Sequence, residues 1–282
     1  MTETISFIKD SLSPFFPENE IQRFVRLILE HVTGLSPHQI LMNKDKELSG
    51  MEKKEIREIL HRLKQSEPIQ YILGETEFYG LTFQVNPSVL IPRPETEELV
   101  EGIIRDRKGK ETRLVDIGTG SGCIAVSLAH ALPEARISAV DICSKALATA
   151  RKNAEQNQVT VEFIESDILD TQRSKKDIPG ELDCIVSNPP YVLHQEKEQM
   201  EKNVLDHEPH LAIFVPDTDP LLFYRAIAVL GREKLKEDGT LYFEINGMFG
   251  QEVVDLLKIY GYKNIQLKKD LPGKDRMIKA EK

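Results

Sequence analysis

The stretch Leu114-Val115-Asp116-Ile117-Gly118-Thr119-Gly120-Ser121-Gly122 decides the fold of this chain. It begins like a buried strand, continues through three glycines at alternate positions and leads into an apolar helical pattern. Glycines permit a tight turn and remove side chains that would block a ligand, although they could also serve helix packing alone. The stretch therefore predicts a strand, a glycine loop and a helix in succession, with a ligand at the loop as the functional interpretation.

Strand and helix patterns alternate after this loop, which is typical of a parallel sheet. The predicted strands cover residues 114–115, 137–140, 161–164, 182–186, 240–245, 264–268 and 277–279. Predicted helices include residues 145–157, with Ser144 as the cap, and a helix near residues 251–260. We expect an α/β Rossmann-like sheet in residues 94–282, mostly parallel with an antiparallel C-terminal strand.

The chain before this region carries different patterns. Ile21, Phe24, Val25 and Ile28 form one apolar helical stripe, and residues 1–75 predict four or five short helices, interpreted as a substrate-recognition domain. Residues 76–93 alternate like strands and predict a β-hairpin linker. A further amphipathic helix follows, for which Thr96 is a plausible cap and nearby glutamates could act only as dipole complements.

Charge and composition limit the classes of function. The chain has 282 residues, a net charge of −9 and a pI of about 5.4. Proteins that grip nucleic acid through its phosphates usually have the opposite charge, so no direct nucleic-acid contact is expected.

The three cysteines and seven histidines show no zinc spacing, so no metal is expected. Neither a signal peptide nor a long apolar run is found, so we expect a cytoplasmic protein without membrane contact.

Acidic residues close the predicted strands beside the glycine loop. Asp141 ends the next strand about 20 residues on, where a carboxylate accepts both hydroxyls of a ribose. The loop is neither a Walker loop nor a dinucleotide fingerprint, and acidic strand ends suit a positively charged ligand. The sequence thus favours S-adenosyl-L-methionine over NAD, with S-adenosyl-L-homocysteine as product, Asp167 on the adenine amino group and Ile168 against its face. The candidate cofactor-binding residues are Gly118, Thr119, Gly120, Ser121, Gly122, Asp141, Asp167, Ile168 and Asn188.

Asn188-Pro189-Pro190-Tyr191 follows the apolar run of residues 182–186. Prolines supply no N–H to a strand ladder, so the chain must leave the sheet at its carboxyl edge, where ligands of α/β proteins bind. The alternative is a rigid loop that only ends the strand. The Asn188 side-chain oxygen and the Pro189 carbonyl would accept hydrogen bonds from a planar amide or amine, on which Tyr191 would stack. We therefore predict Asn188, Pro189 and Tyr191 as catalytic residues.

The chain resembles the peptide chain release factor N5-glutamine methyltransferases, the PrmC/HemK family, over nearly its full length. The matching stretches are Pro68-Ile69-Gln70-Tyr71-Ile72-Leu73-Gly74, Phe78-Tyr79-Gly80-Leu81, Leu90-Ile91-Pro92-Arg93-Pro94-Glu95-Thr96-Glu97, residues 116–122, Ser187-Asn188-Pro189-Pro190-Tyr191 and Glu208-Pro209. Asn-Pro-Pro-Tyr alone is shared with DNA adenine-N6 methyltransferases. The segment from Ile91 to Glu97 narrows the match to protein glutamine methylation.

This resemblance implies a class I methyltransferase that methylates the glutamine in the Gly-Gly-Gln motif of peptide chain release factors 1 and 2. It implies that the N-terminal helices contact the release factor, and we expect the enzyme to be a monomer. The candidate substrate-binding residues are Asn188, Pro189, Pro190, Tyr191, Arg93, Glu95 and Thr96. Rival interpretations are a methyltransferase of ribosomal protein uL3, a sister family with the same loop, and a nucleic-acid adenine-N6 methyltransferase.

Three positions depart from the family pattern. Ile168 replaces a residue that is often aromatic, which weakens stacking on adenine. The residues after Glu208-Pro209 differ, and Glu244-Ile245-Asn246 stands where Glu-Ile-Gly is expected. We interpret the last two departures as peripheral to the chemistry.

Overall fold

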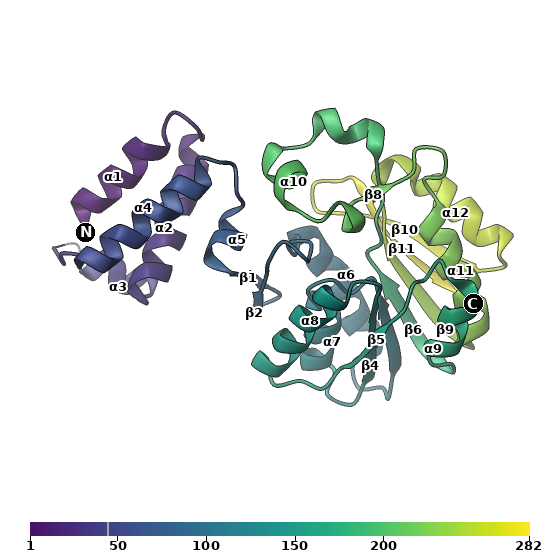
Figure 1. The fold of residues 1–282 in the computed structure, drawn as a ribbon. Coiled ribbons are helices and arrows are strands. Elements are labelled where there is room, and N and C mark those ends of the chain that lie inside the picture. The colour runs from purple at the N-terminus through teal and green to yellow at the C-terminus, as the bar shows by residue number, and fades with distance from the viewer. Residues whose placement is uncertain (44) are drawn as a thin grey trace. The chain divides into compact units, whose positions relative to one another are not determined.

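The computed structural model describes residues 1–43 and 45–282, which form two compact units (Figure 1). One unit consists of Met1–Gly74 and Glu201–His207, and the other of Glu75–Met200 and Glu208–Lys282. The first unit has a hydrophobic core of its own, and the second has one core on each face of its sheet. The functions assigned above to residues 1–75, 76–93 and 94–282 stay predictions.

The N-terminal unit is helical, and its core consists of residues between Met1 and Ile72. Its helices are α1 (Thr2–Leu12), α2 (Glu18–Thr33), α3 (Pro37–Met42), α4 (Gly50–Leu63), α5 (Ile69–Leu73) and α10 (Lys202–His207). The predicted stripe on α2 is buried in this core, as its spacing requires. Helix α3 starts with a capping box formed by Ser36 and Gln39, and Pro37 occupies its first helical position.

The predicted hairpin is present at the start of the second unit. Its strands are β1 (Glu75–Phe78) and β2 (Leu81–Gln84), paired antiparallel. Phe78 and Phe83 are buried and meet edge to face with ring centroids 6.0 Å apart. These two rings join the core beneath the neighbouring helices, so the hairpin is packed onto this unit.

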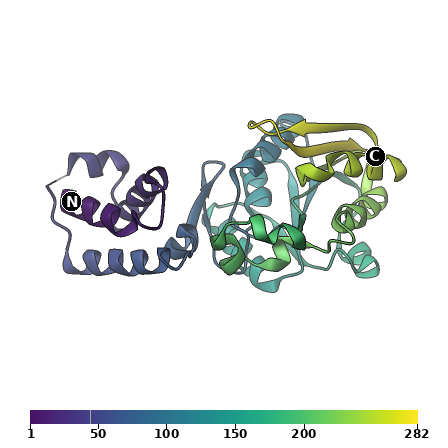
Figure 2. The same ribbon diagram turned by 90° about the horizontal axis from the view of Figure 1, so that it is seen from above.

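A seven-stranded sheet forms the middle of the second unit. Its order is β10-β11-β9-β6-β3-β4-β5. The strands are β3 (Arg113–Ile117), β4 (Arg136–Asp141), β5 (Glu162–Glu165), β6 (Leu182–Ser187), β9 (Leu235–Glu244), β10 (Lys263–Lys269) and β11 (Asp275–Glu281). Strand β11 is antiparallel to both of its neighbours, and the strands from β9 to β5 are parallel. This arrangement confirms the expected mostly parallel sheet, and Figure 2 shows the C-terminal strands, in yellow, at one edge.

Helices cover both faces of this sheet (Figure 1). One face packs against α6 (Pro94–Arg107), α7 (Cys123–Ala131) and α8 (Ser144–Gln156), and the other against α9 (Thr171–Asp177), α11 (Leu222–Lys234) and α12 (Gly250–Ile259). Buried central strands are therefore apolar on both sides, which explains why their sequences read as short continuous apolar runs. Across residues 1–43 and 45–282, the helices are all too short or too polar to span a bilayer.

Two predicted helix caps are wrong. Helix α8 begins at Ser144 itself, so the cap position belongs to Cys143, which makes no side-chain capping bond. Helix α6 begins at Pro94 after Arg93, so Thr96 lies inside the first turn. Proline at the first helical position needs no N–H partner, and it moves the start of α6 ahead of the threonine.

The sequence left residues 192–234 without predicted elements, and the structure fills them with short pieces. These are β7 (Val192–Leu193), η1 (His194–Gln199), α10, η2 (His210–Ala212) and β8 (Phe214–Val215), followed by the longer helix α11. Strands of two residues have no periodicity that a sequence pattern can display. Strands β7 and β8 pair in parallel and keep this part of the chain beside the carboxyl edge of the sheet.

Candidate active site

A cavity of about 370 Å³ lies at the carboxyl edge of the parallel strands. Register pairs Ile117 of β3 with Val140 of β4 and with Ser187 of β6, so these strand ends lie side by side. The predicted residues that line the cavity are Arg93, Thr96, Gly118, Thr119, Gly120, Ser121, Asp141, Asp167, Ile168, Asn188, Pro189 and Pro190. The predicted site residues Gly122, Tyr191 and Glu95, all within the described part of the chain, do not line it.

Asp141 is bound to the glycine loop by its own carboxylate. One oxygen, Oδ2, accepts from the N–H of Gly120 at 2.9 Å, and Oδ1 accepts from the N–H of Cys143 at 2.9 Å. Burial raises the pKa of Asp141, while these backbone hydrogen bonds oppose the rise. Each oxygen keeps a second lone pair, so the carboxylate can hold the loop and still accept hydrogen bonds from a ligand.

The glycine loop leaves open space where side chains would stand. Gly118 and Gly120 have positive φ angles of 76° and 55°, and a Cβ at either position would meet no heavy atom within 4 Å. Gly122 differs, because a Cβ there would lie 3.0 Å from Cβ of Ala150 on α8. Gly118 and Gly120 therefore leave room for a ligand, while Gly122 lets α7 and α8 pack closely. With Asp141 beside the loop, these residues fit a nucleoside-containing cofactor.

Asp116 lies behind the glycine loop and does not reach the cavity. Its side chain is buried, and Oδ2 accepts from the Thr119 hydroxyl at 2.6 Å. Burial raises the pKa of Asp116 to about 7, against the hydrogen bond from Thr119, and the nearby charge of Asp141 adds to the rise. Its other oxygen, Oδ1, is buried and has no partner in the described part of the chain.

This raised pKa predicts a pH dependence of stability. Between about pH 4 and pH 7 the Asp116 carboxyl is protonated in the folded protein and ionised in the unfolded protein. The free energy of unfolding therefore falls as pH rises through this range. Asp116→Asn removes this titration. We expect the variant to gain stability relative to the wild type across this window, by on the order of 1 kcal/mol per pH unit, and to keep a constant advantage above it. Urea unfolding of both proteins from pH 4 to pH 8 measures the difference, and parallel stability curves would contradict the prediction.

The Asn188-Pro189-Pro190 loop begins where β6 ends. The Ser187 hydroxyl donates to the carbonyl of Ile117 at 2.6 Å and ties this strand end to β3. The Asn188 side-chain N–H donates to the Thr96 hydroxyl at 3.3 Å. In the described part of the chain, the Asn188 side-chain oxygen and the Pro189 carbonyl accept no hydrogen bond. Two adjacent acceptors on a cavity wall match the two N–H groups of a planar amide.

Tyr191 lies behind this loop. Its hydroxyl donates to Oε1 of Glu244 at 3.0 Å, and its ring packs against the core of the sheet. Burial raises the pKa of Tyr191 well above its usual range, and the Glu244 charge adds to this effect. The structure therefore gives Tyr191 a structural contact, and its stacking on a substrate stays a prediction.

Arg93 is paired with an acidic residue that was not among the predicted site residues. Its guanidinium donates to Oε1 of Glu208 at 2.6 Å, and Oε2 of Glu208 accepts from the N–H of Ile91 at 3.1 Å. The Glu208 side chain is 1% exposed, so this carboxylate fastens the segment before α6 to the chain beyond the Asn188 loop. The Glu208-Pro209 match in the sequence was the signal that pointed to it.

Glu244 and Asn246 do not line the cavity, but each contacts a predicted site residue, and the peripheral role of the Asn246 departure stays a prediction. Glu244 is buried at the carboxyl end of β9 and contacts both Thr96 and Tyr191. The Asn246 side-chain N–H groups donate to the carbonyl of Tyr191 at 3.1 Å and to Oε2 of Glu196 at 3.2 Å. Asp141 was found in the sequence because an acidic residue ends a predicted strand. The same criterion, used for β9, would have found Glu244.

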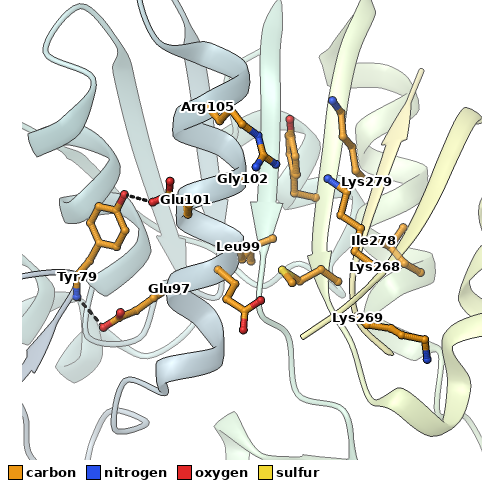
Figure 3. A pocket seen from close by; sticks show the side chains of 13 residues that line it. Tyr79, Glu97, Leu99, Glu101, Gly102, Arg105, Lys268, Lys269, Ile278 and Lys279 are labelled. Atoms are coloured by element: carbon orange, nitrogen blue, oxygen red, sulfur yellow. Dashed lines mark hydrogen bonds between the residues drawn. The ribbon is translucent and has the colours of Figure 1, made fainter. Parts of the chain in front are cut away.

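A second cavity, of about 400 Å³, lies between α6 and the strands β10 and β11 (Figure 3). Figure 3 shows Tyr79 held at its rim by α6, where its backbone N–H donates to Glu97 at 2.9 Å and its hydroxyl to Glu101 at 2.6 Å. Lysines of β10 and β11 stand opposite, so both signs of charge line this cavity. It contains none of the predicted site residues, all of which are described, and the cavity at the strand ends is therefore the candidate active site.

Comparison with known proteins decides the family. The PrmC N-terminal domain model matches residues 17–74, and the methyltransferase small domain model matches residues 96–210. A release factor glutamine methyltransferase of Flavobacterium psychrophilum is 51% identical over 274 residues, which cover 96% of this chain and 95% of that protein. The chain belongs to the release factor glutamine methyltransferase family. A second member, from Bacteroides thetaiotaomicron, is 47% identical over 283 residues and covers 100% of both chains.

Comparison with solved structures concerns the fold of the chain. The catalytic domain of hMettl16, solved in complex with the MAT2A 3′UTR hairpin 6, superposes with a TM-score of 0.54 at 18% sequence identity, covering 77% of this chain and 80% of that one. At this identity the likeness concerns the fold, and it confirms the expected Rossmann-like class I methyltransferase architecture. Membership in the release factor glutamine methyltransferase family confirms the resemblance and makes the chain a protein-glutamine methyltransferase.

Proposed function

We propose that this enzyme transfers a methyl group from S-adenosyl-L-methionine to the side-chain nitrogen N5 of the glutamine in the Gly-Gly-Gln motif of bacterial class 1 release factors. The observation that supports it most is the pair of free acceptors, the Asn188 side-chain oxygen and the Pro189 carbonyl, on the wall of the cavity that also contains Asp141 and the glycine loop. The family members described above are named release factor glutamine methyltransferases, which agrees with a release factor glutamine as the substrate.

The cofactor would lie along the carboxyl edge of the sheet. Asp141 would accept the ribose hydroxyls, the backbone at Gly118 and Gly120 would approach the ligand closely, and Asp167 and Ile168 would hold the adenine. Bound there, S-adenosyl-L-methionine supplies an electrophilic methyl group on a sulfonium. Ile168 is half-buried against the core, so it offers the adenine an aliphatic contact in place of an aromatic one.

The glutamine amide would be held by this chain's own acceptors. An amide nitrogen is a poor nucleophile because its lone pair is delocalised, so positioning and fixed dipoles must do most of the work. The Asn188 oxygen and the Pro189 carbonyl would each accept one N–H, which aims the nitrogen and stabilises the positive charge that develops on it. The C–S bond of the sulfonium breaks as the N–C bond forms, S-adenosyl-L-homocysteine leaves as the thioether, and the nitrogen then loses one proton to solvent. The buried carboxylate of Glu244 accepts from Thr96 and Tyr191, and so it holds these two side chains.

The same proposal extends to the protein substrate, the oligomeric state and the cellular compartment. We assign release factors 1 and 2 as substrates, the N-terminal unit as the part that contacts them, the monomer as the active form and the cytoplasm as the compartment. Leu41, Met42 and Met51 of the N-terminal unit are 62%, 74% and 84% exposed, which supports contact with a protein partner. The net charge of −9 and the names of the relatives argue against the nucleic-acid and uL3 alternatives.

Methylation of purified substrates tests this function. The enzyme, S-adenosyl-L-methionine and unmodified release factor are incubated, and the tryptic peptide with the Gly-Gly-Gln motif is analysed by mass spectrometry. We expect a mass increase of one methylene group, located on the glutamine by fragmentation. Release factor with glutamine replaced by glutamate, ribosomal protein uL3 and an adenine-containing DNA duplex serve as controls. An unmodified release factor peptide, or faster methylation of uL3, would refute the proposal.

A further inference from the structure

Asn188 stands at the end of a chain of hydrogen bonds that reaches into the core. Its side-chain N–H donates to Oγ1 of Thr96 at 3.3 Å, and the Thr96 hydroxyl donates to Oε2 of Glu244 at 2.6 Å. The other oxygen of Glu244 accepts from the Tyr191 hydroxyl at 3.0 Å. Thr96 is 2% exposed and Glu244 1%, so neither side chain has water as a ready substitute for these partners.

Three separate elements supply this chain of hydrogen bonds. Asn188 directly follows β6, Glu244 ends the neighbouring parallel strand β9, and Thr96 lies in the first turn of α6. Register pairs Ser187 with Phe243, so the next residues, Asn188 just past the end of β6 and Glu244 at the end of β9, lie at the same edge of the sheet. Helix α6 then places the Thr96 hydroxyl between the two side chains.

The number of hydrogens determines which way each group points. Two hydroxyls donate to the two oxygens of Glu244, so both oxygens act as acceptors here, even though burial raises the pKa of this carboxyl. A threonine hydroxyl has one hydrogen, so once Thr96 donates to Glu244 it can only accept from Asn188. A reversed Asn188 amide would place oxygen against oxygen with no hydrogen between them. The Asn188 NH2 group must therefore face Thr96, and its oxygen must face the cavity.

We propose that Thr96 and Glu244 are positioning residues that fix the orientation of the Asn188 amide, so that its oxygen, and not its NH2 group, meets the substrate. This inference rests on the function proposed above. If the Asn188 amide could flip, its NH2 group would take the place of its oxygen in one of the two orientations. In that orientation its N–H donors would face the N–H donors of the glutamine amide, and no hydrogen bond could form. Because the Asn188 amide is oriented before the substrate binds, no free energy is needed to reorient it during the reaction. This is the advantage of a preorganised site.

Thr96→Val is the decisive variant, because it removes the hydroxyl and keeps the branched shape. We expect kcat for release factor methylation to fall about tenfold, the value of one positioned hydrogen bond. The cofactor Kd and the KM for release factor should change less than about threefold, since neither depends on the orientation of this amide alone. Thr96→Ser restores the hydroxyl and should return kcat to near the wild-type value.

A double-mutant cycle separates positioning from general support of the fold. If Thr96 acts through Asn188, Thr96→Val should cost little further kcat in an Asn188→Ala background. Thr240→Val is the matched control, because Thr240 is a buried threonine on β9 that accepts from the Arg107 guanidinium at 2.8 Å, away from the cavity. Thr240→Val should keep the wild-type kcat even where its loss of unfolding free energy equals that of Thr96→Val.

Each outcome of these measurements has a distinct meaning. Wild-type kcat in Thr96→Val, failure of serine to restore it, or losses that add in the double variant would overturn the positioning role while methylation by the wild type stands. A wild-type enzyme that leaves the release factor unmodified would overturn the proposed function, and this inference with it. A selective loss of kcat, restored by serine and absent in the Asn188→Ala background, would establish the positioning role.

Discussion

Asn188→Ala should lower the turnover of release factor methylation by about 2 kcal/mol or more, roughly thirtyfold, and leave cofactor binding largely intact. Asn188 lines the cavity, and its side-chain oxygen accepts no hydrogen bond from the described residues, while its NH2 group donates to Thr96. Alanine removes the acceptor that would meet the glutamine N–H as positive charge develops on the nitrogen. The glycine loop and Asp141, which would carry most of the cofactor contact, are untouched.

Single-turnover methylation with saturating cofactor measures this loss, and calorimetric titration with S-adenosyl-L-homocysteine checks the cofactor site. Asn157→Ala is a suitable control, because the Asn157 amide donates to the carbonyls of Thr82 and Asn153 and does not line the cavity. Turnover within about twofold of the wild type in Asn188→Ala would remove Asn188 from the proposed chemistry.

Asp141→Ala should weaken cofactor binding about a hundredfold. Its two oxygens would accept the ribose hydroxyls, and hydrogen bonds to a charged group contribute about 1.5–3 kcal/mol each. The same oxygens accept from the N–H groups of Gly120 and Cys143, so their loss also frees the glycine loop from its position. The effect should therefore be visible in binding itself, before any methyl transfer.

Titration with S-adenosyl-L-homocysteine measures this change directly. Asp255→Ala removes the same charge from an exposed position on α12, away from the cavity, and should leave the Kd unchanged. A similar Kd for Asp141→Ala and the wild type would show that the ribose is held elsewhere. Equal weakening in both variants would point to net charge and not to the position of Asp141.

Long periodic elements could be predicted from the sequence because their information is local. The stripe on α2 and the apolar runs of the central strands were found in this way, and the antiparallel C-terminal strand was expected. Element boundaries were harder, since Thr96 and Ser144 look like helix caps yet lie inside their helices. The two-residue strands β7 and β8 escaped because pairing with each other, and not periodicity, defines them, whereas α11 carries a helical stripe through Tyr224, Ile227 and Ala228 that was overlooked.

By itself the sequence determined the strand, glycine loop and helix order, the loop at Asn188, and Asp141 at the end of its strand. Each is a short pattern of neighbouring residues whose chemistry is visible without a fold. Only the tertiary structure decided that Thr96, Glu244 and Asn188 form one chain of hydrogen bonds, since Thr96 is separated along the sequence by 92 positions from Asn188 and by 148 positions from Glu244. The physical reason is the parallel register of β6 and β9, which brings distant strand ends to the same edge, where a helix can bridge them.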